Sequence, residues 1–325
     1  MKKIATNFIA VLFLVLPLSM TAQDFEKVDN IVKNYPKSFS SVEKLSDLIN
    51  KDFKREDEKA RAIFTWIATN VKYDLQAYSK GQQVAFSYKT EEEKTALQKK
   101  YNEELALKTL KTKKGVCQGY ATLFNLLCEQ TGLESVFIAG TSKSALTHIG
   151  KAPTIVGDHA WNAVKIDNQW KLVDVTWGAG SVSGTPAVFN FRFNDVYFFS
   201  EPDFFFLNHF PEDEKWLLTN KEKKEFTDLP LYYTSALKEK YIFSSPYQGS
   251  IEYPATKSIP FKIDNLQISD RISYSFSKSK KITEIQNVNN NGTAEFSIPL
   301  DNHSLGFLTI FINQKAVAAY RINRG

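Results

Sequence analysis

The spacing of apolar side chains divides the chain into a region with helical periodicity and a region of short strands. Apolar residues recur every three to four positions from Ala60 to Val71, which predicts an amphipathic helix. A second such pattern starts at Ala121 and ends at Gly132, a residue typical of helix C-termini. We expect these two helices to pack on each other within an α+β fold.

Beyond about residue 235 the helical pattern gives way to short alternating segments separated by Asn, Asp, Gly, Lys and Ser. The predicted strands are 250–253, 261–263, 272–276, 294–298, 307–312 and 316–322. Such closely spaced strands are typical of a β-sandwich. The pattern therefore predicts an immunoglobulin-like accessory domain over residues 233–325, after a first domain over residues 23–232.

The sequence alternates in the manner of a β-hairpin on both sides of Asp167-Asn168, a two-residue loop that tolerates positive φ. Counting outward from that loop along both strands places Trp161 opposite Asp174. His159 lies two residues from Trp161, so it shares the same face and becomes the diagonal neighbour of Asp174. Diagonal neighbours are roughly 7–8 Å apart at the backbone, which lets the carboxylate reach the imidazole.

Cys117 lies at the start of the second predicted helix, and Gly115 and Gly119 on either side are expected to leave room for a substrate. Unpaired N–H groups and the helix dipole favour the thiolate there, and the thiolate is the attacking species. Taken singly, such a Cys is usually a packing residue, and a His on a strand is usually satisfied by a local hydrogen bond. The ordered set favours catalysis instead, with Cys117 as nucleophile, His159 as base and acid, and Asp174 orienting the imidazole.

Three segments around these residues resemble the core of the transglutaminase-like superfamily; their sequences are GVCQGYA, GDHAWNAV and WKLVDVTW. Segments at 62–74 and 209–216 are similar to its kyphoscoliosis-peptidase branch, and the resemblance spans about residues 57–218. It implies a papain-like fold, in which the helix that bears the nucleophile packs on an antiparallel sheet, with a Cys–His–Asp triad at the three positions named above. The superfamily includes transglutaminases, peptidases and proteins that have lost activity, so the resemblance specifies the triad better than the reaction.

The resemblance leaves open which two donors stabilise the tetrahedral oxyanion. The backbone N–H of Cys117 can be one of them. Papain-like enzymes take the second from a Gln six residues before the Cys, where this chain has Lys111. The candidates near the cleft are Gln118, Trp161 and Trp177. Gln118 is expected to point elsewhere and both indoles to form cleft walls, so the second donor stays unassigned.

Three further features each allow a packing role and a substrate role. The insert at 75–113 contains a stretch rich in Lys and Glu that is typical of a solvated helix, although its place before Cys117 would suit a lid. The phenylalanines of segment 189–206 are expected in a sheet core, with an aromatic substrate wall as the alternative. Trp66 and Tyr73 lie off the helical stripe and are expected to pack.

Only two cysteines occur, and both lie on the same predicted helix. At 1.5 Å per residue, Cys117 and Cys128 would be about 16 Å apart, too far for a disulfide. Cys128 is therefore expected to be buried packing. His148, His209 and His303 are scattered without metal-ligand spacing, so no metal and no cofactor is predicted.

Residues 1–22 have the pattern of a secretory signal peptide, with two lysines, an apolar run and small residues near the end. The run is shorter than the ~20 residues of a spanning helix, so an N-terminal anchor is the second choice, and no later segment is apolar enough. Removal of Lys2 and Lys3 lowers the formal charge by two, from +5 to +3, which gives no support for nucleic acid as a partner. An exported chain without a disulfide resembles a bacterial extracytoplasmic protein, periplasmic or secreted.

Together these features predict an exported cysteine enzyme that transfers an acyl group from a protein or peptide amide through a thioester. Water as the acceptor makes it a peptidase or amidase, which we favour slightly because of the branch it resembles; an amine makes it a crosslinking enzyme. The β-sandwich would dock the substrate or cell-surface and envelope material. The alternative is a binding protein without turnover that holds a peptide or glycan in its cleft.

Overall fold

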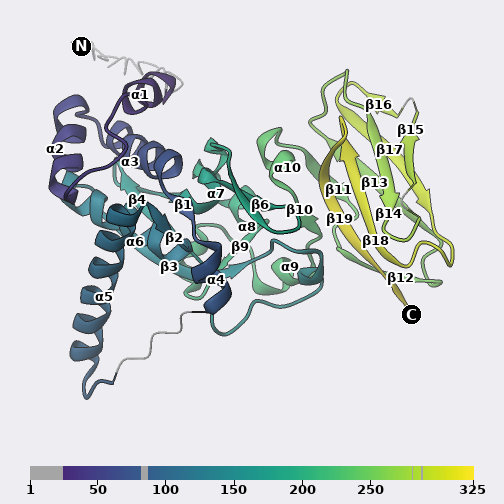
Figure 1. Ribbon diagram of the computed structural model, residues 1–325. Helices are drawn as coiled ribbons and strands as arrows, with labels where there is room; N and C mark the ends of the chain where they lie inside the picture. Colours follow the sequence, from purple (N-terminus) through teal and green to yellow (C-terminus); the bar gives the residue numbers. More distant parts are fainter. Residues whose placement is uncertain (1–24, 82–86, 280, 287) are drawn as a thin grey trace, which may run out of the picture.

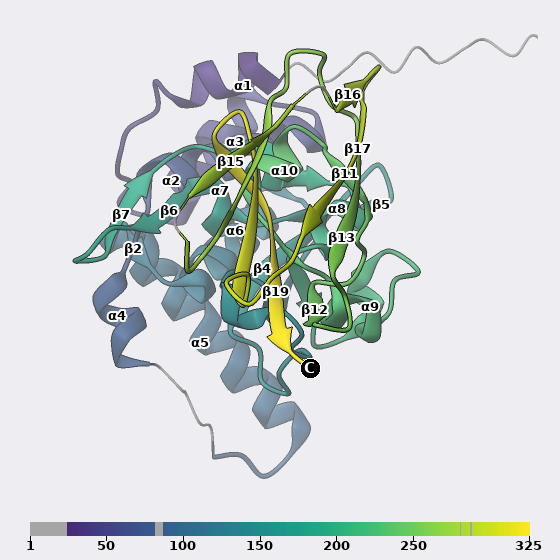
Figure 2. The ribbon, with the colours of Figure 1, turned by 90° about the vertical axis from the view of Figure 1, so that its right-hand side faces the viewer.

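The computed structural model describes residues 25–81, 87–279, 281–286 and 288–325 and shows a mixed α+β part followed by C-terminal strands (Figure 1). This confirms the expected fold class. Figure 2 views the molecule from the side of the C-terminal strands, which lie in front of the helical part. The expected signal peptide, 1–22, lies outside the described residues. Within them, no helix is both long and apolar enough to cross a membrane.

In the part of the chain that the structure describes, six helices precede the main sheet, and the amphipathic ones bury the side on which their apolar residues recur. They are α1 (Phe25–Val32), α2 (Val42–Asp52), α3 (Glu56–Asn70), α4 (Leu75–Lys80), α5 (Glu91–Thr112) and α6 (Cys117–Thr131). Ala60, Ile63 and Ile67 of α3 are fully buried, and α3 packs on α6 as expected. After α6, Gly132 has a φ of +82°, the left-handed conformation that favours glycine.

A five-stranded antiparallel sheet lies against α6, with the strand order β8-β5-β4-β3-β9. Its strands are β3 (Ser135–Ser142), β4 (His159–Ile166), β5 (Gln169–Val173), β8 (Phe198–Ser200) and β9 (His209–Pro211). The predicted hairpin register is confirmed, because Ile166 pairs with Gln169 and Asn162 with Val173. Both residues of the two-residue loop have positive φ, as the turn types of short hairpins require.

Short elements flank this sheet and connect its strands. They are β1 (Lys72–Tyr73) and β2 (Lys114–Gly115), which pair in parallel; the hairpin of β6 (Gly180–Ser183) and β7 (Val188–Phe191); α7 (Val175–Ala179), α8 (Pro202–Phe206) and α9 (Lys223–Asp228); and the 3-10 helices η1 (Leu146–His148), η2 (Asp195–Tyr197) and η3 (Glu214–Leu217). The pairing of β1 with β2 brings the end of α3 beside the start of α6.

The C-terminal strands form two sheets that pack against each other. One has the order β10-β19-β18-β14-β15, with β12 also beside β19, and the other has the order β11-β13-β17-β16. The bounds are β10 (Leu231–Tyr232), α10 (Thr234–Lys238), β11 (Ile242–Ser245), β12 (Ser250–Tyr253), β13 (Ser258–Asp264), β14 (Ile272–Phe276), β15 (Ile282–Ile285), β16 (Asn289–Asn290), β17 (Thr293–Pro299), β18 (Gly306–Ile312) and β19 (Lys315–Arg324). Phe261 of β13 meets the ring of Tyr320 of β19 edge-on, so the two sheets share one core.

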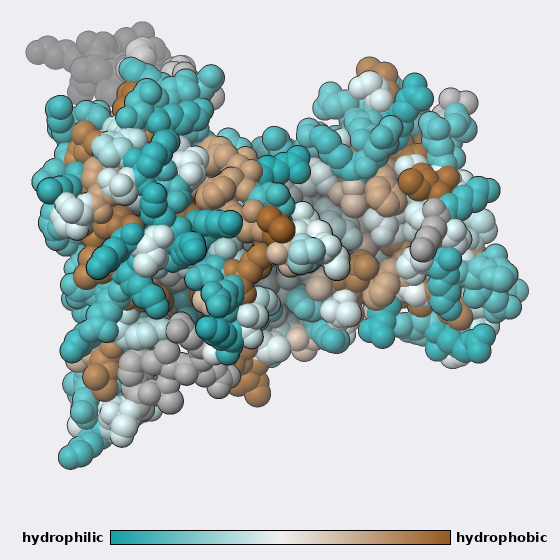
Figure 3. All heavy atoms as spheres, viewed as in Figure 1, coloured by the Kyte–Doolittle hydropathy of each residue, from teal (hydrophilic) through white to brown (hydrophobic). Residues whose placement is uncertain are grey.

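Strand pairing and side-chain packing, in addition to the covalent chain, connect the mixed part to the C-terminal part. β10 precedes the expected domain boundary at residue 233, yet Leu231 of β10 pairs with Ala319 of β19. Ile149, which follows η1, packs with both of these residues. In the space-filling view, hydrophilic side chains cover most of both parts and apolar atoms gather between them (Figure 3).

α5 is the mostly exposed helix expected within the insert, with one side buried against α6 around Thr109. The two glycines that flank the candidate nucleophile serve this contact rather than a substrate. A Cβ at Gly119 would lie 2.6 Å from Oγ1 of Thr109, and one at Gly115 would lie 3.2 Å from its Cγ2. The expectation that these glycines leave room for a substrate was therefore wrong, because the room is filled by α5.

The remaining packing predictions concern buried side chains. Phe189, Phe198, Phe205 and Phe206 are at most 6% exposed, whereas Phe191 and Phe193 are 51% and 37% exposed, so half of the phenylalanines in this segment belong to the core. Trp66 is fully buried and donates its indole N–H to the carbonyl of Pro36. Cys128 is also fully buried, and both cysteines are free thiols, as the helix predicts.

Candidate active site

Cys117 is the first residue of α6 and is 9% exposed, in the first helical turn as expected. Val116 precedes it as the N-cap and makes no side-chain hydrogen bond to this turn. The thiol packs with Ala121 of the same helix, Ala160 of β4 and Phe137 of β3. The backbone N–H groups at a helix start have no partner within the helix, so this position suits a group that develops negative charge.

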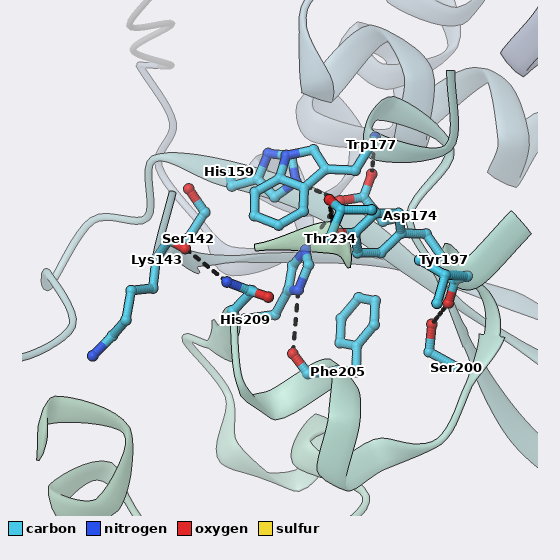
Figure 4. Close-up of polar contacts among 12 residues, drawn as sticks. Ser142, Lys143, His159, Asp174, Trp177, Tyr197, Ser200, Phe205, His209 and Thr234 are labelled. Carbon is cyan, nitrogen blue, oxygen red and sulfur yellow. Dashed lines mark hydrogen bonds and ion pairs between the residues drawn. The ribbon is translucent and has the colours of Figure 1, made fainter. Parts of the chain in front are cut away.

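His159 and Asp174 are joined by a hydrogen bond of 2.7 Å between Nε2 and Oδ2 (Figure 4). β4 begins at His159, and Asp174 follows β5 directly as the N-cap of α7, so the hairpin brings the two side chains together. The other carboxylate oxygen, Oδ1, accepts the backbone N–H of Trp177 at 3.0 Å. Both side chains are buried, and Asp174 is 0% exposed.

His159 and Asp174 each stabilise the charged form of the other. Burial by itself lowers the pKa of the His159 imidazole, but Asp174, and after it Cys117, outweigh burial and raise that pKa to about 10. Burial raises the pKa of the Asp174 carboxyl, but His159 and then His209 hold it well below its usual range. Since the Cys117 thiol is among the groups that raise the pKa of His159, the thiol lies near the imidazole, and the structure brings the three predicted residues into one site. Because Nε2 faces Asp174, Nδ1 is the nitrogen left for the thiol.

Sequence reasoning missed a fourth side chain of this site, His209. Its Nε2 lies 3.0 Å from Oδ2 of Asp174, the same oxygen that contacts His159. The pairing of β9 with β3, in which His209 lies opposite Ser142, puts it there. His209 opens one of the segments that carried the family resemblance, which was the available signal, but its distance along the chain from Asp174 gave no reason to expect contact.

The same cluster is the one group in the described residues whose spacing could suit a metal ion. His159, Asp174 and His209 each bring one ligand-type atom within 4.8 Å of the others, and two imidazoles with a carboxylate are ligands that transition metals accept. Hydrogen bonds from both rings to a single carboxylate oxygen account for this spacing. The cluster therefore fits a proton-holding network, and we assign no metal to it.

A cleft of about 630 Å³ opens beside His159. Its walls come from β1 and α4, the loop after β3, α7, the β6–β7 hairpin, and residues 231–234 at the start of the C-terminal part. Uncharged aromatic and hydroxyl side chains predominate in the lining, and Asp158 supplies an exposed carboxylate. Lys143 also contributes, but its ammonium donates to the carbonyls of Phe226 and Leu229, and Figure 4 shows it pointing away from His159.

The other predicted cleft residues divide between the cleft and the core. Trp177 lines the cleft, with its ring centroid 5.4 Å from that of His159. Trp161 was expected to form a cleft wall but is 1% exposed, because Phe205 and His209 pack on it, and its Nε1 has no hydrogen-bond partner within the described residues. Gln118 is exposed and lies outside the cleft lining.

Comparison with known proteins gives a family match and several similar proteins. Residues 43–175, which include Cys117, His159 and Asp174, match the family model of the transglutaminase-like superfamily. The chain is 31% identical over 228 residues to the kyphoscoliosis peptidase of Mus musculus, and 32% identical over 201 residues to that of Homo sapiens. These alignments cover 70% and 62% of this chain but 32% and 28% of the relatives, so the chain spans about a third of their length. A crystal structure of a TGase is similar with a TM-score of 0.30 and 18% identity, over 57% of this chain and 40% of that chain.

Proposed function

Because the chain belongs to the transglutaminase-like superfamily through residues 43–175, we propose that it is a cysteine enzyme that transfers the acyl group of a protein or peptide amide through a thioester. The observation that carries this proposal is the buried hydrogen bond between His159 and Asp174 beside the first residue of α6. An imidazole that a carboxylate orients next to a thiol is the arrangement that activates a cysteine nucleophile.

The proposed reaction uses each group in turn. His159 takes the proton of the Cys117 thiol, and the sulfur forms a bond to the carbonyl carbon of the amide. The tetrahedral intermediate collapses with loss of the C–N bond, and the imidazolium of His159 gives its proton to the departing amine. Water or a second amine then attacks the thioester and passes a proton to His159. The C–S bond breaks, and the returned proton restores the thiol. Asp174 keeps the ring oriented throughout.

The oxyanion forms at the start of α6, where the backbone N–H of Cys117 is one donor. We assign the second donor to the hydroxyl of Tyr73, which lines the same cleft as His159. Burial raises the pKa of Tyr73, and the nearby Cys117 adds to the effect, so the phenol keeps its proton and stays a donor. This assignment replaces the expected packing role of Tyr73.

The lining of the cleft bears on the substrate. Tyr73, Tyr78, Trp177 and Phe189 offer apolar faces to a peptide, and Asp158, whose carboxylate accepts the backbone N–H of Ser142, adds a negative charge to the lining. Acidic side chains would be repelled there, and uncharged or basic ones accepted. A cleft of this volume suits one large side chain with its adjoining backbone, which favours a peptide or an unfolded protein segment as substrate.

Three finer points complete the proposal. Water is the favoured acceptor, because the curated relatives are named peptidases. Export to the bacterial periplasm or beyond rests on the signal-like pattern of residues 1–22. The C-terminal β-sandwich, which we take to be immunoglobulin-like, would dock the substrate or envelope material.

One observation favours a second candidate, a binding protein without turnover. Cys117 is only 9% exposed, and the lining of the cleft includes His159 but not the thiol. A site that hides its nucleophile would hold a peptide or glycan without cutting it.

A denatured protein substrate, incubated with and without a fluorescent primary amine and followed by mass spectrometry, separates these functions. Hydrolysis yields new chain termini or deamidated side chains, and amine transfer yields fluorescent adducts. Cys117→Ala should abolish either product, whereas Cys128→Ala, which removes the buried thiol of the same helix, should retain it. A wild-type protein that binds the substrate but forms neither product would exclude the enzyme and leave the binding protein.

A further inference from the structure

Two imidazoles share one oxygen of a fully buried carboxylate. Nε2 of His159 lies 2.7 Å and Nε2 of His209 lies 3.0 Å from Oδ2 of Asp174. Oδ1 of the same carboxylate accepts the backbone N–H of Trp177 at 3.0 Å. Asp174 thus has three donors, of which a Cys–His–Asp triad by itself accounts for one.

Aromatic neighbours hold the His209 ring in place. Phe205 stacks on it with ring centroids 3.9 Å apart, Trp177 lies at 4.6 Å, and Trp161 meets it edge-on at 5.0 Å. Figure 4 shows the imidazole pointing at Asp174 with the Phe205 ring beside it. The side chain is 0% exposed and does not line the cleft. Any effect of His209 on the reaction must therefore pass through Asp174.

The contacts of the ring indicate a neutral His209 with its proton on Nε2. Burial lowers the pKa of His209 below its ordinary value, and the charge of His159 acts in the same direction. A neutral imidazole has one N–H to donate. The Asp174 carboxylate at 3.0 Å from Nε2 is a stronger acceptor than the carbonyl of Phe205 at 3.3 Å from Nδ1, so the proton belongs on Nε2.

Three phenols are among the other ionisable groups near Asp174. Tyr73, Tyr120 and Tyr197 each feel its charge, and burial raises the pKa of all three. Because burial raises their pKa values, these phenols stay neutral through the acid and neutral range and add no titration of their own there. A change in pH behaviour caused by altering His209 can therefore be assigned to this network.

We propose that His209 is a positioning residue of the triad, whose Nε2–H keeps the Asp174 carboxylate ionised and turned toward His159. The inference rests on the proposed function, since the carboxylate matters for reactivity only if His159 activates Cys117. Without this donor, Asp174 would be easier to protonate and freer to rotate. As the pH falls, Asp174 would then take up a proton at a higher pH than in the wild type. The imidazolium of His159 would lose its counter-ion at that point.

The first test compares the pH profile of iodoacetamide alkylation at Cys117 in three variants. In His209→Phe, which keeps an aromatic ring but cannot donate, we expect the rate at neutral pH to fall roughly tenfold and the acid limb to move to higher pH. His209→Gln puts an amide N–H near the position of Nε2. It should restore much of the alkylation rate at neutral pH and return the acid limb of the profile toward its wild-type position. Phe206→Leu changes the neighbouring buried phenylalanine, which packs on Phe210 and Phe226, so its acid limb should match the wild type. If His209→Phe has the wild-type limb, or if a folded His209→Gln behaves like His209→Phe, the positioning role is overturned.

The second test does not depend on a working nucleophile. The chain has four histidines, so selective ¹⁵N labelling yields four imidazoles that can be assigned by substitution. We expect His209 to be the neutral Nε2–H tautomer and to resist protonation at pH 6, whereas His159 stays doubly protonated at pH 7. A His209 that titrates near 6.5, or that carries its proton on Nδ1, would overturn the inference. If wild-type Cys117 shows no reactivity that depends on His159, the proposed function fails, and this spectrum still decides the role of His209.

Discussion

Tyr73 lies opposite Gly115 in the short parallel pairing of β1 with β2. Gly115 is two residues before Cys117 along the chain, so the pairing brings Tyr73 near the start of α6. This pairing places the phenol at the wall of the cleft, close enough to Cys117 for the thiol to affect the pKa of Tyr73. The position suits a donor to the oxyanion, which the sequence left unassigned.

Tyr73→Phe should lower kcat roughly 100-fold with little change in KM, because an oxyanion donor stabilises the tetrahedral intermediate more than the bound substrate. The rate of iodoacetamide alkylation at Cys117 should not change, since no oxyanion forms in that reaction. Tyr78→Phe, on the same wall, is the control and should keep the wild-type kcat. Equal kcat values for both variants would return Tyr73 to a packing role.

Asp174→Ala should be strongly destabilising, because it removes the partner of two buried imidazoles and the acceptor at the start of α7. Breaking a buried network of this kind typically costs about 3–5 kcal/mol. Urea denaturation followed by tryptophan fluorescence measures the loss in free energy of unfolding. Asp47→Ala, at an exposed position of α2, is the matched control. A cost for Asp174→Ala as small as that of the control would mean that the network contributes little to folding.

The free energy of unfolding should depend on pH because of the ion pair between His159 and Asp174. In the unfolded chain His159 has a pKa of about 6.5, and in the folded protein it is raised to about 10. Between these values the folded state holds a proton that the unfolded state has lost. The stabilisation from this group is thus complete below pH 6.5 and is lost as the pH rises through 10. To exclude the proton that Cys117 itself can lose, the comparison is made in Cys117→Ala, whose melting temperature should fall more steeply than that of Cys117→Ala/His159→Gln over this interval; parallel curves would refute the raised pKa.

Gly119→Ala should destabilise the contact between α5 and α6, because the new Cβ would lie 2.6 Å from Oγ1 of Thr109. Thr109→Ala removes that atom, so the double variant should recover stability relative to Gly119→Ala alone, as a double-mutant cycle in urea would measure. Additive losses in the cycle would show that Thr109 is not what excludes a side chain at residue 119.

The parts of the site that could be predicted from sequence are those set by local periodicity. The two-residue loop at Asp167-Asn168 specifies the register of β4 against β5, and that register brings His159 to Asp174. In the same way the helical pattern that ends at Gly132 placed Cys117 in a first turn. Each of these inferences needed only side-chain spacing along one element or one hairpin.

The parts that could not be predicted depend on contacts between distant segments. His209 reaches Asp174 only because β9 pairs with β3, which no local pattern indicates. Trp161 shares a face of β4 with His159, but period-2 alternation cannot show that Phe205 covers one end of that face and leaves the other at the cleft. Likewise, glycine at residue 119 signals a close approach without saying that α5 makes it.

The central claim is that His159 activates Cys117, and the pH dependence of iodoacetamide alkylation at Cys117 in the folded protein tests it most directly. Mass spectrometry separates this thiol from Cys128, and His159→Ala is the comparison. The account predicts alkylation that persists well below pH 8.5, the pKa of a free thiol, and that is lost at low pH in the variant. A Cys117 that reacts only at the pH of an ordinary thiol, or equally in both proteins, would contradict the account and favour the binding protein.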